Sequence, residues 1–173
     1  MADAATIEIW SGGDCAGPPG YGYGGWTWLI VQGGAARGWV GGEKHSTKGR
    51  MVLRAMIEAL KAAADQPTAP LQLDPGDAAA TRIGADLKAR QAAGWRTADD
   101  EPIEDAELWA EIARLAVARA APVRFTSAGA SDARVFVAAW TDFARDRCKT
   151  KGAFTSAIPK PNLTTFLVKR ARP

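Results

Sequence analysis

Hydrophobic residues recur along the chain with two different periods, which predict alternating groups of strands and helices. Period-two alternation between glycine and proline turns predicts five strands, at 6–11, 26–31, 38–41, 71–73 and 123–126. Apolar residues at helical spacing predict four helices, at 50–64, 77–92, 104–120 and 132–148. The order βββαβααβα predicts an α/β fold in which helices flank a five-stranded mixed sheet.

Two of the predicted helices have recognisable ends or faces. Asp77 is a good N-cap for the second helix, because a carboxylate at that position can accept a hydrogen bond from the first turn. In the last helix, we expect the apolar face to consist of Val135, Phe136, Ala139, Trp140 and Phe143.

Length and composition indicate one domain with a core of its own. The chain has 173 residues, of which 47% are hydrophobic. A chain of this size buries roughly 70% of its unfolded surface, so its stability requires neither disulfides nor a structural metal. Cys15 and Cys148 are therefore expected to be free thiols, as in a cytoplasmic protein. No signal-peptide pattern or membrane-length apolar run is found, so we expect no membrane association.

Charge is distributed unevenly along the chain. The net charge is +3, yet residues 144–173 contain eight basic residues and one acidic residue, whereas residues 99–111 contain seven acidic residues and no basic one. Such runs are typical either of solvated surface or of contact with a charged partner. We divide the chain into a domain at 1–148 and a basic C-terminal extension at 149–173.

Common catalytic motifs give little indication of function. Gly20, Gly22 and Gly25 match the spacing of a dinucleotide fingerprint, but they join two predicted strands and no helix follows to bind a pyrophosphate. His45 is the single histidine, and the sequence around it supports neither a serine nor a cysteine triad.

Several segments resemble type 1 ribonuclease H. The first predicted strand, Ile-Glu-Ile-Trp-Ser at 7–11, and the following Cys-Ala-Gly-Pro-Pro-Gly at 15–20 and Gly-Gly-Trp at 24–26 resemble the first hairpin of that family. Arg-Met-Val-Leu-Arg-Ala at 50–55 resembles its first helix, and Gly-Trp-Arg-Thr-Ala-Asp at 94–99, with Pro102 and Leu-Trp at 108–109, its basic protrusion. The resemblance spans about 6–145 and implies a ribonuclease H-like fold.

The resemblance also implies a chemistry, the cleavage of the RNA strand of RNA·DNA hybrids by two divalent metals held by four carboxylates. At the matching positions this sequence has Gly12, Val52 and Thr141 in place of three of them, and Asp77 at the remaining one. The family's loop histidine is also missing from 127–134. These replacements predict a catalytically inactive protein.

Two nearby acids leave an alternative open. Asp14 lies two residues beyond Gly12, a displacement of about 6–7 Å along a strand. Asp142 lies one residue beyond Thr141, a rotation of about 100° around a helix. We interpret both as polar surface, and the alternative is a rebuilt metal site that uses Asp77, Asp14 and Asp142.

The leading hypothesis is a catalytically inactive ribonuclease H-like protein that binds nucleic acid or a nucleic-acid-handling protein, without a cofactor. The alternatives are a divergent metal-dependent ribonuclease H, which would use Mg²⁺, and a module that binds only proteins. The sequence leaves the oligomeric state open. The candidate nucleic-acid-binding residues are Lys88, Arg90, Trp95, Arg96, Lys149, Lys151, Lys160, Lys169, Arg170 and Arg172.

Overall fold

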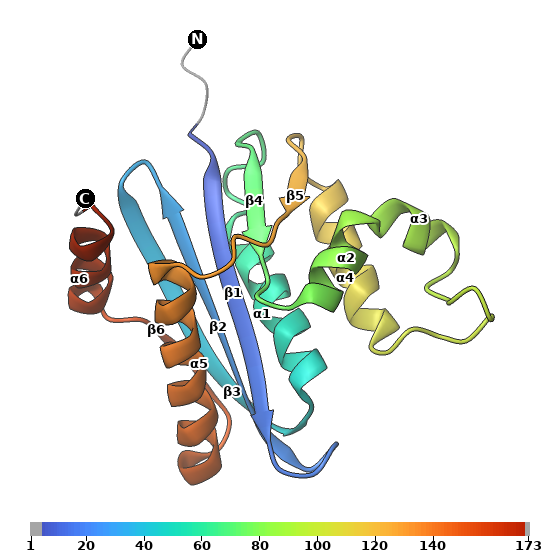
Figure 1. The fold of residues 1–173 in the computed structure, drawn as a ribbon, viewed down its shortest axis with the longest axis horizontal. Helices are drawn as coiled ribbons and strands as arrows, with labels where there is room; N and C mark the ends of the chain where they lie inside the picture. Colours follow the sequence, from blue (N-terminus) through green and yellow to red (C-terminus); the bar gives the residue numbers. More distant parts are fainter. Residues whose placement is uncertain (1–4, 172–173) are drawn as a thin grey trace.

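The computed structural model describes residues 5–171, which form one six-stranded sheet flanked by helices (Figure 1). Its strands are β1 (Ile7–Ala16), β2 (Gly22–Gln32), β3 (Ala35–Ser46), β4 (Leu71–Asp74), β5 (Val123–Phe125) and β6 (Phe154–Ala157). Its helices are α1 (Lys48–Ala62), α2 (Ala78–Ala85), α3 (Leu87–Ala92), α4 (Ala106–Val117), α5 (Asp132–Lys151) and α6 (Lys160–Arg170). No helix in these described residues is long and apolar enough to cross a membrane.

The sheet has the mixed topology that the sequence predicts, with one strand more than expected. The order is β5-β4-β1-β2-β3-β6, in which β1, β2 and β3 form an antiparallel meander and β4 and β5 run parallel to β1. The five-strand prediction is corrected by β6, which pairs antiparallel with residues 39–42 of β3. Its four residues, Phe-Thr-Ser-Ala, are too few to give a strand pattern. The division of the chain after residue 148 remains a prediction.

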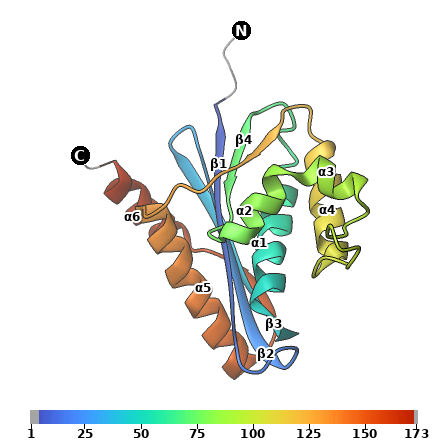
Figure 2. The same ribbon diagram turned by 45° about the vertical axis from the view of Figure 1, so that its right-hand side comes forward.

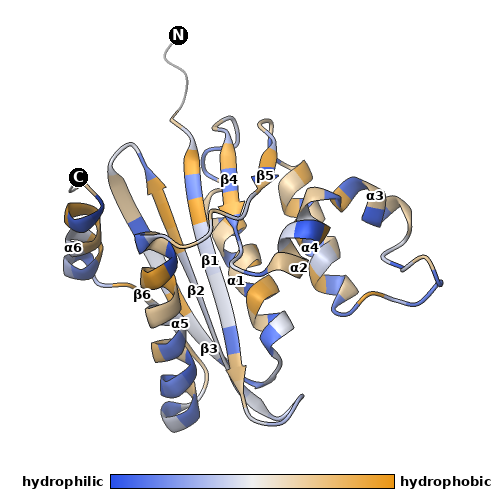
Figure 3. Ribbon diagram, viewed as in Figure 1, coloured by the Kyte–Doolittle hydropathy of each residue, from blue (hydrophilic) through white to orange (hydrophobic). Residues whose placement is uncertain are grey.

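Alternation along β2 divides the core between the two faces of the sheet. Trp26, Trp28 and Ile30 belong to the cluster that α1 and α4 cover, whereas Leu29 and Val31 belong to the cluster that α5 and α6 cover. Figure 2 shows α1 and α5 on opposite faces, and Figure 3 shows hydrophilic residues concentrated in the C-terminal turns of α5. Because helices cover both faces of the sheet, few positions of the long meander face solvent and carry polar side chains.

The single helix predicted at 77–92 is two helices, α2 and α3, which meet at Asp86. Asp86 leaves the helical conformation, with φ −121° and ψ 24°, and acts as C-cap of α2. The prediction for the start of this region is confirmed, because the Asp77 side chain accepts a hydrogen bond from the Ala80 amide at 2.9 Å.

The prediction for the apolar face of α5 holds only in part, because Phe136 and Trp140 pack against the core cluster of that face but other residues of the set are exposed. The residues that face the sheet are small, whereas Val135 is 69% and Phe143 45% exposed. The physical reason is a close approach of the helix to the glycines of the meander: a Cβ placed at Gly25 would lie 2.6 Å from the Thr141 carbonyl oxygen, and one at Gly42 would lie 2.6 Å from the Cys148 Cβ. The buried face consists of Ala133, Val137, Thr141, Ala144 and Cys148.

We expect Gly25→Ala to destabilise the protein by about 1–3 kcal/mol or more, because its methyl group would overlap the backbone of α5. The matched control is Gly49→Ala in the first turn of α1, where the nearest atom lies 3.8 Å from the new Cβ and the stability should stay the same or rise. Urea unfolding of both variants measures the difference. Equal stabilities would contradict the close packing of α5.

Candidate active-site cleft

A cleft of about 230 Å³ lies where the second half of β1, the start of α1, the loop after β4 and the first half of α5 meet. It contains three of the four positions at which the sequence resemblance places metal-binding carboxylates. The lining residues are Gly12, Gly13, Asp14, Lys48, Val52, Pro75, Gly76, Arg134, Val137, Ala138, Thr141 and Asp142.

The three replaced positions are tightly packed. A Cβ at Gly12 would lie 2.9 Å from Val137 Cγ1 and 3.2 Å from Thr141 Oγ1. Thr141 is buried, and its hydroxyl donates a hydrogen bond to the Val137 carbonyl at 2.8 Å. Val52 is also buried, in the core between α1 and the sheet. None of these side chains supplies a carboxylate to the cleft.

Asp77, the fourth position, is directed elsewhere. Its carboxylate caps α2, and it lines a neighbouring hollow of about 160 Å³ together with Val52 and Asp105. His45 lies exposed near the end of β3, where its ring meets the Tyr21 ring edge-on at 6.4 Å.

The acid at the end of β4 is Asp74, which the sequence reasoning missed. Asp74 is 4% exposed, and its carboxylate accepts hydrogen bonds from the amides of Gly76 at 2.8 Å and Ala128 at 3.0 Å. Arg134 forms an ion pair with it at 2.9 Å and also donates to the Ser11 carbonyl at 2.6 Å. The sequence did offer an indication of this site, because Asp74 directly follows the predicted strand at 71–73.

Burial lowers the pKa of Arg134, an effect that the neighbouring Asp74 carboxylate opposes. The guanidinium remains charged, because the ordinary pKa of arginine is far above neutral pH. The ion pair therefore leaves neither buried charge without a partner.

Asp14 and Asp142 meet at the outer side of the cleft, on one guanidinium. Arg145 forms an ion pair with Asp14 and another with Asp142 at 3.0 Å, and it also contacts Asp146 at 3.1 Å. The hydrogen bond to Asp14 is the main cause of a raised pKa at Arg145. Asp14 is displaced along β1 and Asp142 around α5, and the two displacements bring both acids to the same guanidinium. The sequence analysis considered each displacement separately and did not predict this contact.

The acids of the cleft differ from the two-metal centre that the resemblance to ribonuclease H implies. Within residues 5–171 no three side chains of His, Cys, Asp or Glu lie together so as to hold a metal ion. Arg134 holds Asp74, and Arg145 holds Asp14 and Asp142. The residues of the cleft do not fit a two-metal centre.

The candidate nucleic-acid-binding residues fall into two groups. In the protrusion, Lys88 is exposed, Arg90 lies 3.8 Å from Asp86 and Arg96 lies 2.6 Å from Asp100. Trp95 is partly buried and packs against the core cluster that α1 and α4 cover. The structure therefore places two of these cations in local ion pairs.

The second group lies at the C-terminal end of the chain. Arg170 pairs with Glu8 at 2.6 Å, whereas four lysines are exposed and have no ion pair among residues 5–171. Arg172 lies outside the described residues. The four lysines are Lys149, Lys151, Lys160 and Lys169.

Comparison with known proteins identifies the family. The chain is 36% identical to ribonuclease H of Cupriavidus necator over 110 residues, which cover 64% of this chain and 74% of that protein. It belongs to the ribonuclease H family. Ribonuclease H of Hyphomonas neptunium is 37% identical over 109 residues, which cover 63% of this chain and 71% of that protein. No family model matches the chain.

Solved structures agree on the ribonuclease H fold. LC9-RNase H1, described as a type 1 RNase H with the type 2 active-site motif, has a TM-score of 0.74 and 18% identity over 98% of this chain and 82% of its own. RNase H1 from the halophilic archaeon Halobacterium salinarum has a TM-score of 0.55 and 20% identity over 82% of this chain and 98% of its own. The predicted ribonuclease H-like α/β fold is confirmed.

The prediction of a catalytically inactive binding protein is contradicted by these sequence relatives, which are named as the enzyme ribonuclease H. The same finding contradicts the expectation that the chain is not an enzyme. The inactivity prediction rested on the missing acids at the aligned positions and interpreted Asp14 and Asp142 as polar surface, whereas both line the cleft.

We expect Arg134→Met to destabilise the protein by about 3–5 kcal/mol, because it leaves the buried Asp74 carboxylate without its cation. Arg96→Met is the control, since the Arg96–Asp100 pair is exposed and should contribute far less. The double change Arg134→Met with Asp74→Asn should recover much of the loss. Urea unfolding at pH 7 gives the three values, and an Arg134→Met loss as small as that of Arg96→Met would refute a supporting role for the ion pair.

Proposed function

We propose that this chain hydrolyses the RNA strand of RNA·DNA hybrids. This is the reaction of the metal-dependent alternative offered by the sequence, and the proposal takes over the reaction without the two-metal centre of that alternative. The observation that carries the proposal is its 36% identity to a named ribonuclease H over 74% of that protein's length. The cleft supports the proposal because it lies where residues from β1, α1 and α5 meet, at the positions that the resemblance assigns to the active site.

An RNA·DNA hybrid is a suitable ligand for the charges around the cleft. Lys48 lines the cleft at the first position of α1, and it is exposed and without an ion pair among the described residues. A phosphate near it would also meet the positive end of the α1 dipole. A foamy viral protease-reverse transcriptase, 20% of whose chain matches 82% of this fold with a TM-score of 0.66 and 12% identity, has been solved in complex with an RNA/DNA hybrid.

Hydrolysis of a phosphodiester requires a proton acceptor for the attacking water and positive charge near the phosphate. Asp142 is the more accessible acid of the cleft, since its side chain is 61% exposed and that of Asp14 is 35% exposed. We assign proton acceptance to Asp142. Lys48 supplies positive charge at the cleft, and Arg145 positions Asp142 through their ion pair.

A cleavage assay on a labelled RNA·DNA hybrid tests this function, with parallel reactions in Mg²⁺, Mn²⁺ and EDTA. We expect cleavage of the RNA strand, and a rate about 100-fold or more lower for Asp142→Asn, because general-base catalysis contributes about 10²–10⁴-fold. Asp65→Asn is the matched control: that side chain is 60% exposed, lies beyond the end of α1 and should leave the rate unchanged.

The control also separates this protein's activity from a contaminating nuclease. A contaminant would cleave equally in the wild-type, Asp142→Asn and Asp65→Asn preparations. Equal cleavage by all three, or none by the wild type under every ionic condition, would overturn the proposed function.

A further inference from the structure

A ladder of aromatic rings lies along the side of α5 that meets α6, partly packed against the core cluster of that face and partly exposed. Phe136, Trp140 and Phe143 follow one another at helical spacing, with ring centroids 6.3 Å and 5.3 Å apart. Phe166 of α6 continues the ladder, 5.0 Å from Phe136. Phe143 is 45% exposed and Trp140 is half-buried, so part of this ladder faces solvent. The close packing of α5 on the sheet turns these large side chains outward.

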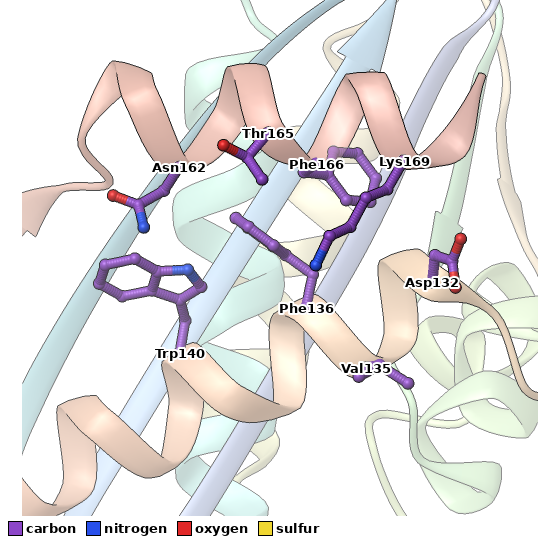
Figure 4. A pocket seen from close by; sticks show the side chains of 8 residues that line it. All are labelled: Asp132, Val135, Phe136, Trp140, Asn162, Thr165, Phe166 and Lys169. Carbon is purple, nitrogen blue, oxygen red and sulfur yellow. The ribbon is translucent and has the colours of Figure 1, made fainter. Parts of the chain in front are cut away.

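A groove of about 370 Å³ runs between α5 and α6 over this ladder. Figure 4 shows Asn162 of α6 facing the Trp140 ring across the groove, and the Lys169 ammonium directed toward Phe136. The groove thus combines exposed ring surface with an amide that can both donate and accept hydrogen bonds, and with one cation. Asp132, at the end near Lys169, is its one acidic lining residue.

The α6 side of the groove is basic. Lys169 lines the groove, and Lys160 begins α6 two residues before the lining residue Asn162. Both lysines are exposed and have no ion pair among residues 5–171. This positive charge favours an anionic ligand over a cationic or neutral one.

We propose that the α5–α6 groove is a second nucleic-acid site, which binds a single-stranded segment of RNA or DNA. Unpaired bases stack on the rings of Trp140 and Phe143, and phosphates contact Lys169 and Lys160. Aromatic rings with a basic border are typical of single-strand binding, because every base offers a π-face and every nucleotide a phosphate. Paired bases in a duplex are already stacked on one another and cannot use these rings.

This site is separate from the cleft, with which it shares no lining residue. A single strand held there would be the unpaired part of a substrate whose paired part reaches the cleft. Because the two sites share no residue, binding of a single strand in the groove does not require hydrolysis at the cleft.

Fluorescence anisotropy with fluorescein-labelled 12-nucleotide oligothymidylate and oligouridylate tests the site in the full-length protein. We expect Trp140→Leu to weaken binding about fivefold or more, because stacking on that ring is lost. Trp140→Phe keeps an aromatic ring and should retain most of the affinity. The matched control is Trp39→Leu, since Trp39 is also partly exposed, at 42%, and does not line the groove.

The phosphate contacts are tested by salt dependence. The double change Lys160→Gln with Lys169→Gln should weaken binding at 50 mM salt and reduce the slope of log K against log salt by about 0.7 for each lost contact. Lys61→Gln, an exposed cation on α1 with a 47% exposed side chain, should have little effect.

Circular dichroism and the thermal midpoint show whether each variant is folded. If Trp140→Leu does not fold, Trp140→Phe still tests the site. No binding by the wild type at 50 mM salt would overturn the proposal, as would equal losses in Trp140→Leu and Trp39→Leu. Asp142→Asn should bind single strands normally, and Trp140→Leu should cleave short blunt hybrids normally. These two variants separate failure of the groove from failure of the proposed hydrolysis.

Discussion

The close approach of α5 to the glycines of β2 and β3 is the constraint on which the rest of the structure depends. Gly25 and Gly42 leave room for the helix backbone itself, so only small side chains fit on the contact face. The same approach places Val137 and Thr141 against Gly12 and brings Arg134 and Arg145 to the cleft. It also leaves the aromatic residues of α5 on the outer face, where α6 covers them only in part.

The cleft is organised by two arginines of α5. Arg134, in its first turn, neutralises the buried Asp74, and Arg145, about three turns later, joins Asp14 to Asp142. Buried or half-buried charges need such partners, because an isolated one would carry a large desolvation penalty. The chain therefore combines the sheet of ribonuclease H with a cleft whose acids and cations come from other positions than the sequence resemblance implies.

Much of the fold could be predicted from the sequence, because strand alternation and capping are local. The meander, β4, β5 and the Asp77 N-cap depend on residues close together in the chain. The orientation of α5 could not be predicted in this way. Periodicity identifies the larger apolar face, but which face packs inward depends on glycines more than a hundred residues earlier in the chain.

The same limit applies to the sheet edge and the cleft. The four-residue strand β6 has no strand pattern and forms because β3 offers an unpaired edge. Alignment with the family located Gly12, Val52 and Thr141 at one cleft, since their spacing follows the shared fold. It could not show that Arg145 would bring Asp14 and Asp142 together, because that contact spans 131 residues.

The packing face of α5 can be measured directly by thiol labelling with an aromatic disulfide reagent. Cys148 is 0% exposed against Gly42, and burial raises the pKa of its thiol, so less of the reactive thiolate forms. In a Cys15→Ser background, we predict that Cys148 reacts only as fast as the protein unfolds. A cysteine introduced by Phe143→Cys, with Cys148 changed to Ser, should react at the rate of an exposed thiol. Fast labelling of Cys148 and protection at position 143 would contradict the packing of α5 described above.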